Sequence, residues 1–389
     1  MAIGSAYLRG ARIVVIGAGA VGSVVSYRLA QAGAAVTIVE SRYPGSGTTG
    51  NSFAWLNAFG KPPRAYHRLN ARSIRDHQDL ARELDGDWVH VDGGLQWAYA
   101  DDAEQVENLK TTIKQIRDWG YRVETVSPEQ VMRDLEPDLL LDPDRVAEAY
   151  FTPGEGWLNG VGLAHGAATA AVRRYGATLL DDEVVGFDVV RGGVERVLLR
   201  SGSALTADTV INAAGPSAAR VAALAGADLP IERQPGFVVT TEPAPAALKR
   251  VLHSPEGMIR SDGGWRTLLR RDEFDEHVAT EQPFDVRHPY CQEAVDRLAA
   301  ILPGLRGVRA ESARLGIRPM PRDGLSIVGF DPEVTGLYHV VTHSGITLSA
   351  ALGHLVTEDL LGQAPRELEP YRLERFSGGG RLAYSATDE

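Results

Sequence analysis

Arg318 is the residue of this sequence whose type and setting most clearly call for a chemical explanation. It lies in the segment RLGIRPMPRDGLSIVGF (residues 314–330), between Ile317 and a proline. An arginine in a stretch otherwise fit for burial is costly unless an anion meets it. Its planar fork matches a carboxylate, so a ligand carboxylate is one candidate. The alternative is a structural salt bridge to an acid of the chain, such as Asp323 or Glu311.

The glycines of GAGAVG, residues 17–22, form a second chemical signal. A short apolar run at 13–16 predicts a buried parallel strand before them, and helical spacing of apolar residues up to Gly33 predicts a helix after them. A second strand is predicted at 35–39. In such a unit the first glycine makes the turn, the second admits a pyrophosphate and the third packs helix on strand. The helix N-terminus supplies an anion site.

Glu40 completes this signal, because it lies 18 residues beyond Gly22. That is near the distance expected for a carboxylate that accepts hydrogen bonds from ribose hydroxyls and disfavours a 2′-phosphate. NADP is therefore disfavoured. With the strand, the helix and the acid in place, the pattern predicts dinucleotide binding rather than a purely structural turn.

Three later segments could serve the same ligand. The loop at 41–57 is dense in Gly, Ser and Thr; a strand at 209–213 leads into a turn at Gly215; and a strand at Leu337–Val341 leads through a turn at 343–345 into an apolar-faced helix. Taken singly, each turn could be plain strand-to-helix structure. Together they would place glycine turns at the ends of one sheet, where doubly wound folds bind ligands.

These segments resemble the FAD-dependent family of D-amino-acid oxidase, glycine oxidase and sarcosine oxidase. The resemblance covers nearly the whole chain, through GAGAVG, GTTGNS, INAAGPSA, GIRPMPRDGLSIVG and THSGITLSAALGHL. It implies that the glycine-x-arginine-proline segment leads from a substrate domain back into an FAD domain, and that Arg318 binds the substrate carboxylate. The cofactor-binding set that it implies is Gly17, Gly19, Ala20, Val21, Gly22, Glu40, Ser41, Arg42, Thr48, Thr49, Asn51, Ser52, Val184, Ala214, Gly215, Gly345, Ile346 and Thr347.

Further candidates for the substrate pocket are Arg260, Trp265 and His343. We expect Arg260 and Trp265 on adjacent strands of a hairpin turned at SDGG, where they would line a pocket or simply cover the sheet. His343 either touches substrate or caps a helix. For Trp55 and His67, core packing or a surface role is the favoured interpretation.

The chemistry that the resemblance implies is oxidation of the C–N bond of an amino acid or secondary amine carrying a carboxylate. A hydride would pass from Cα to flavin N5, and the imine would then hydrolyse. Positioning and the flavin do most of this work, so neither a catalytic triad nor a metal is expected. O2 or another acceptor would reoxidise the flavin.

The sequence departs from sarcosine oxidases at three places. Gly316 aligns with the cysteine that attaches their FAD, so non-covalent FAD is expected. Thr347 aligns with a lysine near the carboxylate, which disfavours sarcosine. EGMIRSDGGWRTLL lacks their oxygen-activating lysine, which leaves oxidase and dehydrogenase both open.

Length and composition limit the possible architectures and binding partners. For 389 residues two domains are the default expectation. The predicted fold is α/β: a discontinuous Rossmann-like FAD domain (residues 1–88, 146–228 and 318–389) with an inserted substrate domain (89–145 and 229–317) built on a mixed, largely antiparallel sheet. The net charge of −11 argues against nucleic acid. One cysteine and the lack of an apolar span or leader predict a cytoplasmic protein without membrane contact.

Two other functions remain open from sequence. One is a flavoprotein subunit of a larger dehydrogenase, or a flavin-dependent enzyme that acts on something other than a free amino acid. The other is an NAD dehydrogenase, which INAAGPSA and THSGITLSAALG disfavour. The tail from about Ser377 is expected to be loose, and the oligomeric state is open.

Overall fold

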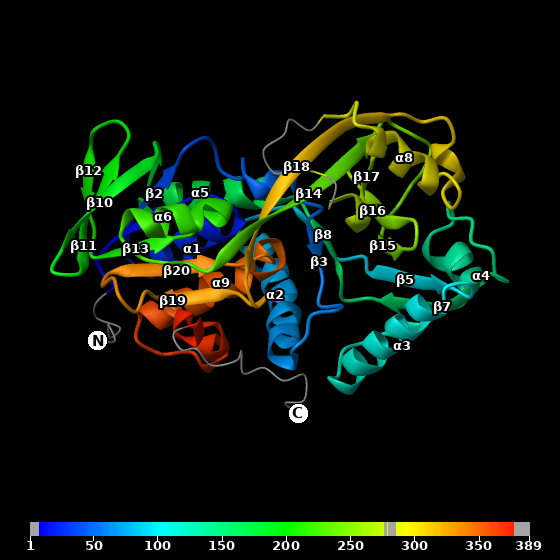
Figure 1. Cartoon of the computed structure of the whole chain (residues 1–389), viewed down its shortest axis with the longest axis horizontal. Helices are drawn as coiled ribbons and strands as arrows, with labels where there is room; N and C mark the ends of the chain where they lie inside the picture. Colours follow the sequence, from blue (N-terminus) through cyan, green and yellow to red (C-terminus); the bar gives the residue numbers. More distant parts are fainter. Residues whose placement is uncertain (1–7, 276–277, 279–284, 377–389) are drawn as a thin grey trace.

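A six-stranded, mostly parallel sheet forms one half of the molecule (Figure 1). The computed structural model describes residues 8–275, 278 and 285–376, and the predicted loose tail lies outside them. Strands pair in parallel except β19, which runs antiparallel to β20 at the edge. The order is β19 (Ile327–Phe330), β20 (Leu337–Val341), β13 (Thr209–Asn212), β1 (Arg12–Ile16), β2 (Ala35–Glu40) and β9 (Thr178–Asp181).

Both faces of this sheet are covered, as near-continuous apolar strands require. Ile13 and Val15 of β1 pack into one core with the helices, whereas Val14 and Ile16 pack into a second core on the opposite face. The helices of the first core are α1 (Ala20–Gln31), α2 (Arg64–Glu83), α5 (Gly160–Tyr175) and α9 (Gly345–Leu360). The second core is covered by α6 (Ala218–Leu224) and a sheet of β10 (Val184–Val190), β11 (Gly193–Leu199) and β12 (Ala204–Thr206).

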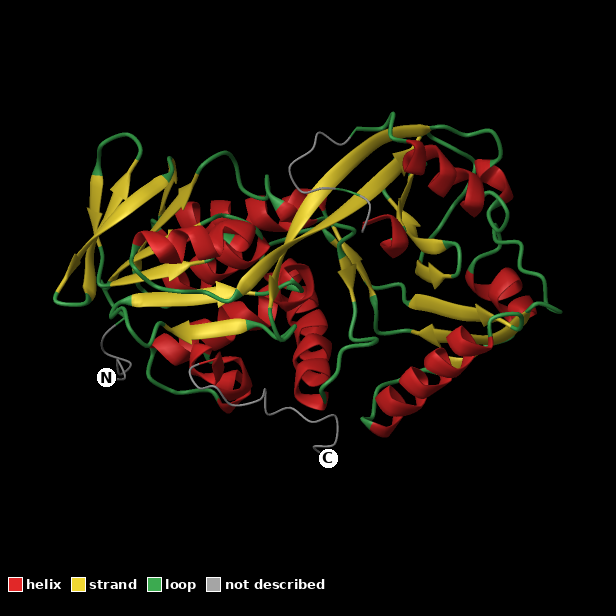
Figure 2. Ribbon diagram, viewed as in Figure 1, coloured by secondary structure: helices red, strands yellow, loops and turns green. Residues whose placement is uncertain are grey.

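An eight-stranded sheet forms the other half (Figure 2). All its neighbouring strands are antiparallel except β15 and β5, which confirms the predicted mixed, largely antiparallel sheet. The order is β18 (Ala310–Pro321), β14 (Ile231–Thr241), β17 (Thr267–Arg270), β16 (Gly257–Ser261), β15 (Val251–Ser254), β5 (Gly94–Tyr99), β7 (Val146–Thr152) and β6 (Glu124–Thr125). Against it pack α8 (Pro289–Leu298) and α3 (Ala103–Asp118).

The long strands β14 and β18 connect the two halves (Figure 1). They pair antiparallel over most of their length, with Gln234 opposite Arg318. A small third sheet consists of β3 (Trp55–Leu56), β8 (Gly156–Leu158) and β4 (Val89–His90), in that order. The remaining helical segments are Thr48–Asn51, Gly215–Ser217, Pro303–Leu305, Arg366–Tyr371 and Leu373–Phe376 (3-10), α4 (Pro128–Gln130), a π-helical turn at Val131–Leu135 and α7 (Asp272–Asp275).

The predicted elements of the sheet with the glycine turns agree with these bounds to within a residue or two. The domain division stays a prediction, and the sheets do not follow its boundaries everywhere: β7, which it assigns to the FAD domain, pairs with β5 in the large sheet, and the boundary at residue 318 falls within β18. In the described part of the chain, no helix has both the length and the apolar character needed to cross a bilayer.

Candidate functional site

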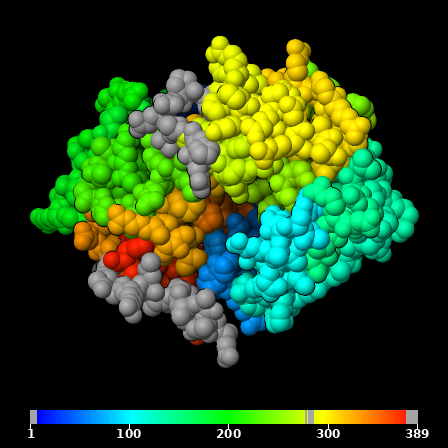
Figure 3. Space-filling model, turned by 45° about the vertical axis from the view of Figure 1, so that its right-hand side comes forward, coloured from blue at the N-terminus to red at the C-terminus, as the bar shows by residue number. Residues whose placement is uncertain are grey.

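A cavity of about 690 Å³ lies where the parallel sheet meets the large sheet. Its wall includes the turn after β1, the end of β2, the loop before α2, and residues of β14, β17 and β18. Figure 3 shows a face of the molecule that is hollowed where the yellow, orange and blue segments meet. The cavity has two chemically different ends, one built of backbone and one built of charged side chains.

The turn after β1 leaves no room for side chains at two glycines. Gly17 has φ +98°, and a Cβ there would lie 2.7 Å from the carbonyl oxygen of Ala213. A Cβ on Gly22 would lie 2.0 Å from the carbonyl oxygen of Gly17, so α1 packs directly against the turn. The N-cap residue, Gly19, has no side chain with which to cap the helix. The amide of Ala20 donates to Thr49, and the amides that follow it at the start of α1 stay available for an anion at this end.

Glu40 lies at the end of β2 beside this turn. Its carboxylate accepts a hydrogen bond from the amide of Ala18 at 2.8 Å and one from the amide of Arg42 at 3.1 Å. Thr49 completes the edge, because its hydroxyl accepts from the amide of Ala20 at 3.0 Å. The carboxylate is thus fixed at the cavity edge, with lone pairs left to accept from ribose hydroxyls.

Of the cofactor residues predicted from sequence, all but Gly22 line this cavity. Gly22 instead packs beneath Gly17, the role expected of the third glycine. Segments from distant parts of the chain converge here: the loop containing Thr48, the turn at Gly215 and the start of α9 at Gly345. Their arrangement fits an extended dinucleotide, since each contributes backbone amides or short polar side chains rather than bulk.

Arg318 lines the other end of the cavity, on β18. Its Nη2 donates to the carbonyl of Pro235 at 3.0 Å and contacts Asp275 Oδ2 at 3.2 Å. Its Nε is buried and has no hydrogen-bond partner among the described residues. Burial, reinforced by Arg270, lowers the pKa of Arg318. The guanidinium is therefore anchored on one side and retains an unused donor.

Arg270 and Arg318 share the carboxylate of Asp275. Arg270 Nη2 lies 2.6 Å from Asp275 Oδ2 and 2.6 Å from Asp272 Oδ1. Burial raises the pKa of Asp275, although both arginines oppose that shift. The two acids that spacing suggested as partners of Arg318 lie elsewhere: Asp323 pairs with Arg375 at 2.7 Å, and Glu311 with Arg266 at 2.5 Å. An acid of the chain does meet Arg318, but it is Asp275.

His343 and Lys61 also line this end. His343 Nε2 lies 2.9 Å from the carbonyl oxygen of Gly324 and 3.3 Å from the hydroxyl of Tyr66. Burial, with Lys61 and Arg318 nearby, lowers the pKa of His343 to about 4, so the imidazole is neutral near pH 7. Lys61 precedes α2 and donates to Ser344 Oγ at 3.0 Å.

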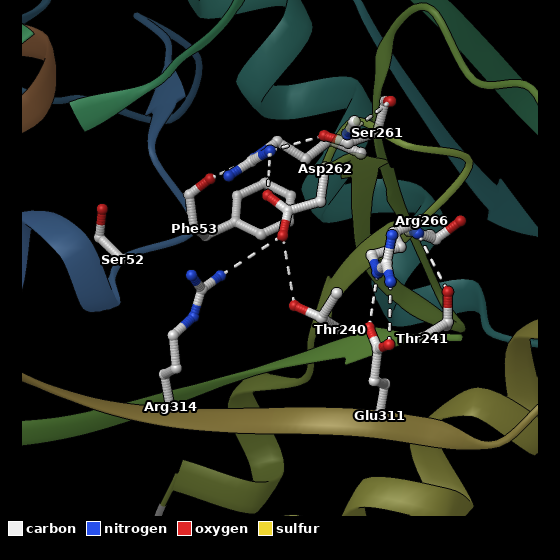
Figure 4. Close-up of polar contacts among 12 residues, drawn as sticks. Ser52, Phe53, Thr240, Thr241, Ser261, Asp262, Arg266, Glu311 and Arg314 are labelled. Atoms are coloured by element: carbon white, nitrogen blue, oxygen red, sulfur yellow. Dashed lines mark hydrogen bonds and ion pairs between the residues drawn. The ribbon is translucent and has the colours of Figure 1, made fainter. Parts of the chain in front are cut away.

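Arg260 and Trp265 lie outside the cavity lining. The predicted hairpin exists as β16 and β17, but Trp265 lies in its turn with φ +59° and is 65% exposed. Arg260 is buried and donates to the carbonyl of Phe53 at 2.6 Å and to Asp262 at 3.1 Å. Asp262 also faces Arg314 (Figure 4), so these side chains form a polar cluster that holds the hairpin.

Several wall residues gave no usable signal in the sequence. Lys61, His253, Arg270 and Asp272 belong to no motif, and only the fold brings them together. Trp55, for which packing or a surface role was favoured, lines the cavity, with its indole nitrogen buried and unpaired among the described residues. His67, in contrast, is a core residue whose Nδ1 lies 2.8 Å from the carbonyl oxygen of Ala58.

Comparisons with known proteins agree with this geometry. The chain matches the model of the DAO family, described as FAD dependent oxidoreductase, over residues 12–359. It is 27% identical over 381 residues to the glycine oxidase of Geobacillus kaustophilus, covering 94% of this chain and 97% of the relative. The crystal structure of glycine oxidase from that organism has a TM-score of 0.82 at 25% identity and covers 95% of this chain and 100% of that chain.

Two further relatives are named as oxidases of other compounds. A subunit of the opine oxidase of Agrobacterium tumefaciens is 25% identical over 373 residues, covering 94% of this chain and 97% of the relative. The crystal structure of iminodiacetate oxidase from Chelativorans sp. BNC1 has a TM-score of 0.77 at 26% identity and covers 93% of this chain and 98% of that chain.

Proposed function

Because the chain belongs to the DAO family of FAD-dependent oxidoreductases, we propose that it oxidises the C–N bond of an amine that carries a carboxylate. The family and the FAD dependence predicted from the sequence are confirmed by the comparisons. The substrate class is the proposal. It rests on the side chains at the charged end of the cavity.

FAD fits the backbone-built end of the cavity. The turn at Gly17 and Gly22 is packed so closely that it keeps its shape, and leaves space for a pyrophosphate, only while both positions lack a side chain. Glu40 lies at the edge of the cavity, where a ribose would bind. When bound, FAD supplies the two-electron acceptor for the hydride that leaves the carbon next to the nitrogen. The single cysteine of the sequence, Cys291, lies buried in α8 rather than in the cavity wall, so non-covalent binding remains our expectation.

The proposal rests on the position of Arg318, which lines the same cavity as the glycine turn and Glu40. Two contacts hold the guanidinium in place, and its Nε has no partner among the described residues. The Arg318 side chain is 26% exposed, so a substrate carboxylate would meet the accessible part of the guanidinium through a charge-assisted hydrogen bond. Fixing the carboxylate orients the neighbouring carbon and nitrogen, which is the main contribution a protein makes to such a reaction.

The remaining steps of the reaction require few side chains of the protein. The oxidised product is an imine, and water cleaves it to a carbonyl compound and an amine. His343 has a pKa of about 4 and is therefore neutral at pH 7. It is too weak a base to take a proton from a substrate ammonium, and its two contacts at Nε2 favour a positioning role. The bound flavin would pass its two electrons to O2 or to another acceptor.

A second candidate function is favoured by one relative. The opine oxidase relative is named as a subunit, and the chain covers 97% of its length. This supports a flavoprotein subunit that delivers electrons to a partner rather than to O2. Anaerobic reduction followed by mixing with O2 separates the two, because a subunit of this kind would reoxidise slowly without its partner.

The test of the proposal is anaerobic reduction of the purified holoenzyme with a panel of D-amino acids, N-substituted glycines and carboxylate-free amines. We expect bleaching of the flavin band by at least one carboxylated amine and by none of the carboxylate-free ones. Arg318→Ala should lower the apparent affinity for that amine by about 10- to 100-fold, the value of one charge-assisted contact.

The matched control is Arg322→Ala, an exposed arginine four positions further along the chain. It should reduce with wild-type kinetics. If carboxylate-free amines bleach the flavin as readily as carboxylated ones, or if Arg318→Ala behaves like Arg322→Ala, the carboxylate proposal is wrong.

A further inference from the structure

We propose that the substrate is an amine carrying two carboxylates, one bound by Arg318 and the second by Lys61. This inference rests on the proposed function above and narrows its substrate class. It makes Lys61 a specificity-determining residue of the cavity.

Lys61, unlike Arg318, was not identified as a candidate in the sequence. It lies in the loop between β3 and α2 and lines the cavity that Arg318 lines. Its ammonium group has three donors, and Ser344 Oγ at 3.0 Å accepts one of them. In the part of the chain that the structure describes, no carboxylate comes within 4.0 Å of it. The group therefore reaches the cavity with donors to spare.

The surroundings of Lys61 call for an anion. Lys61 keeps some accessible surface because it borders the cavity, yet burial and the nearby charges of Arg318 and Arg270 lower its pKa to about 8. Near pH 7 it still carries its charge for most of the time. A cation held this deep without an acid costs free energy, which a bound carboxylate would recover.

Glu155 is the acid of the chain that most favours the charged form of Lys61, but its carboxylate is already engaged. Its Oε1 accepts from the amides of Ala58 at 2.9 Å and Phe59 at 2.8 Å. Burial raises the pKa of Glu155 to about 7, so it is only partly ionised near neutral pH. Glu155 lies outside the cavity lining and leaves the spare donors of Lys61 to a ligand.

The charges at this end of the cavity match a doubly charged ligand. The lining contributes Lys61, Arg270 and Arg318 as cations and Asp272 as an acid, and Asp275 behind the wall pairs with both arginines. Three positive and two negative groups leave one positive charge in excess, which the partly ionised Glu155 behind Lys61 offsets only in part. At neutral pH a singly carboxylated ammonium compound has no net charge, whereas a doubly carboxylated one has a charge of −1 and balances the excess.

The two cations also come from different elements, β18 and the loop before α2, which suits carboxylates at separate ends of one molecule. A secondary amine with a carboxylate on each substituent has this form. Iminodiacetate, named in one of the related structures, is the smallest such compound.

Binding of unreactive thioether analogues to the holoenzyme tests the inference without turnover. Thiodiacetate carries two carboxylates and (methylthio)acetate carries one, and perturbation of the flavin spectrum reports the Kd of each. We expect wild type to bind the diacid about 10- to 100-fold more tightly than the monoacid. Lys61→Met should remove that preference and leave the Kd of the monoacid within about twofold. Lys114→Met, at an exposed lysine of α3, is the matched control and should keep the preference.

Three results would overturn the inference. Wild type could bind the monoacid as tightly as the diacid, a result that needs no variant. Lys61→Met could keep the preference for the diacid. It could also weaken both analogues equally, which would mean that Lys61 acts on the flavin or on the first carboxylate. If wild type instead binds neither analogue and no carboxylated amine reduces the flavin, the proposed function itself fails, so the two failures are distinguishable.

Discussion

The two ends of the cavity are built by different means. At the dinucleotide end, backbone amides and absent side chains define the site, and its residues come from short motifs such as GAGAVG. At the substrate end, charged side chains of β17, β18 and the loop before α2 define it, and they meet only in the folded chain. The first end recognises a ligand that a whole family shares. Under the proposed function, the second end selects the substrate.

Gly22→Ala gives the largest expected effect, because it breaks the backbone-built end. Its Cβ would lie 2.0 Å from the carbonyl oxygen of Gly17, and neither that backbone nor the start of α1 can move without opening the turn. We expect the variant to purify with little or no flavin, as measured by the ratio of flavin to protein absorbance. Gly154→Ala is the control, since its Cβ meets only Tyr121 at an ordinary 3.8 Å. Full flavin occupancy in Gly22→Ala would show that this close approach is not needed.

This contrast also explains what the sequence could predict. Strand, glycine turn and helix are local in sequence, so β1, α1, β2 and the later glycine turns are predictable from spacing. Arg318 was identifiable because it interrupts an apolar stretch. Lys61 was not, because GKPP in a loop resembles any surface turn until α2 and α9 enclose it.

The spacing of residues along the sequence does not show which side chains meet across a sheet. Asp275 reaches Arg318 because α7 packs beside β14, although the two residues are 43 positions apart. Glu311 and Asp323 are nearer in sequence, yet each meets another arginine. Trp265 was expected on a strand, but the two glycines of SDGG place it in the turn itself. In each case a contact distant in sequence, or a turn conformation, decides the outcome.

Arg260→Met changes a charged residue that lies outside the cavity. We expect an effect smaller than that of Gly22→Ala and larger than the pH dependence of analogue binding. Arg260 is 4% exposed, and its loss leaves the carbonyl groups of Phe53 and Ser261 without these donors. Asp262 keeps Arg314 and Thr240, which limits the damage. We expect the free energy of unfolding to fall by about 1–3 kcal/mol in denaturant titration. Binding of (methylthio)acetate to the folded holoenzyme should stay within about twofold of wild type, and a selective loss of that binding would place Arg260 in the substrate site after all.

The pH dependence of analogue binding gives the smallest expected effect. The pKa of Lys61 is lowered to about 8, so its ammonium is present below that pH and lost above it. Guanidinium groups do not lose their proton in this range, His343 stays neutral, and the thioether analogues have no amine to titrate. We therefore expect the Kd of thiodiacetate to rise about tenfold between pH 7 and pH 9 and that of (methylthio)acetate to stay nearly constant.

Lys61→Met supplies the control for that titration, because it should flatten the thiodiacetate profile. A profile that keeps its slope in the variant would assign the titration to another group, and Glu155, with a pKa of about 7, is the first to examine.

The central claim, that Arg318 binds the substrate carboxylate, is tested most directly by a double-mutant cycle between protein and substrate. The rate of anaerobic flavin reduction at low substrate concentration would be measured for wild type and Arg318→Met, each with the best carboxylated amine and with its carboxamide. We expect each single change to slow reduction by about 10- to 100-fold, and the combined change to slow it little further. If the two losses multiply instead, Arg318 and the carboxylate do not interact, and the arginine serves only its ion pair with Asp275.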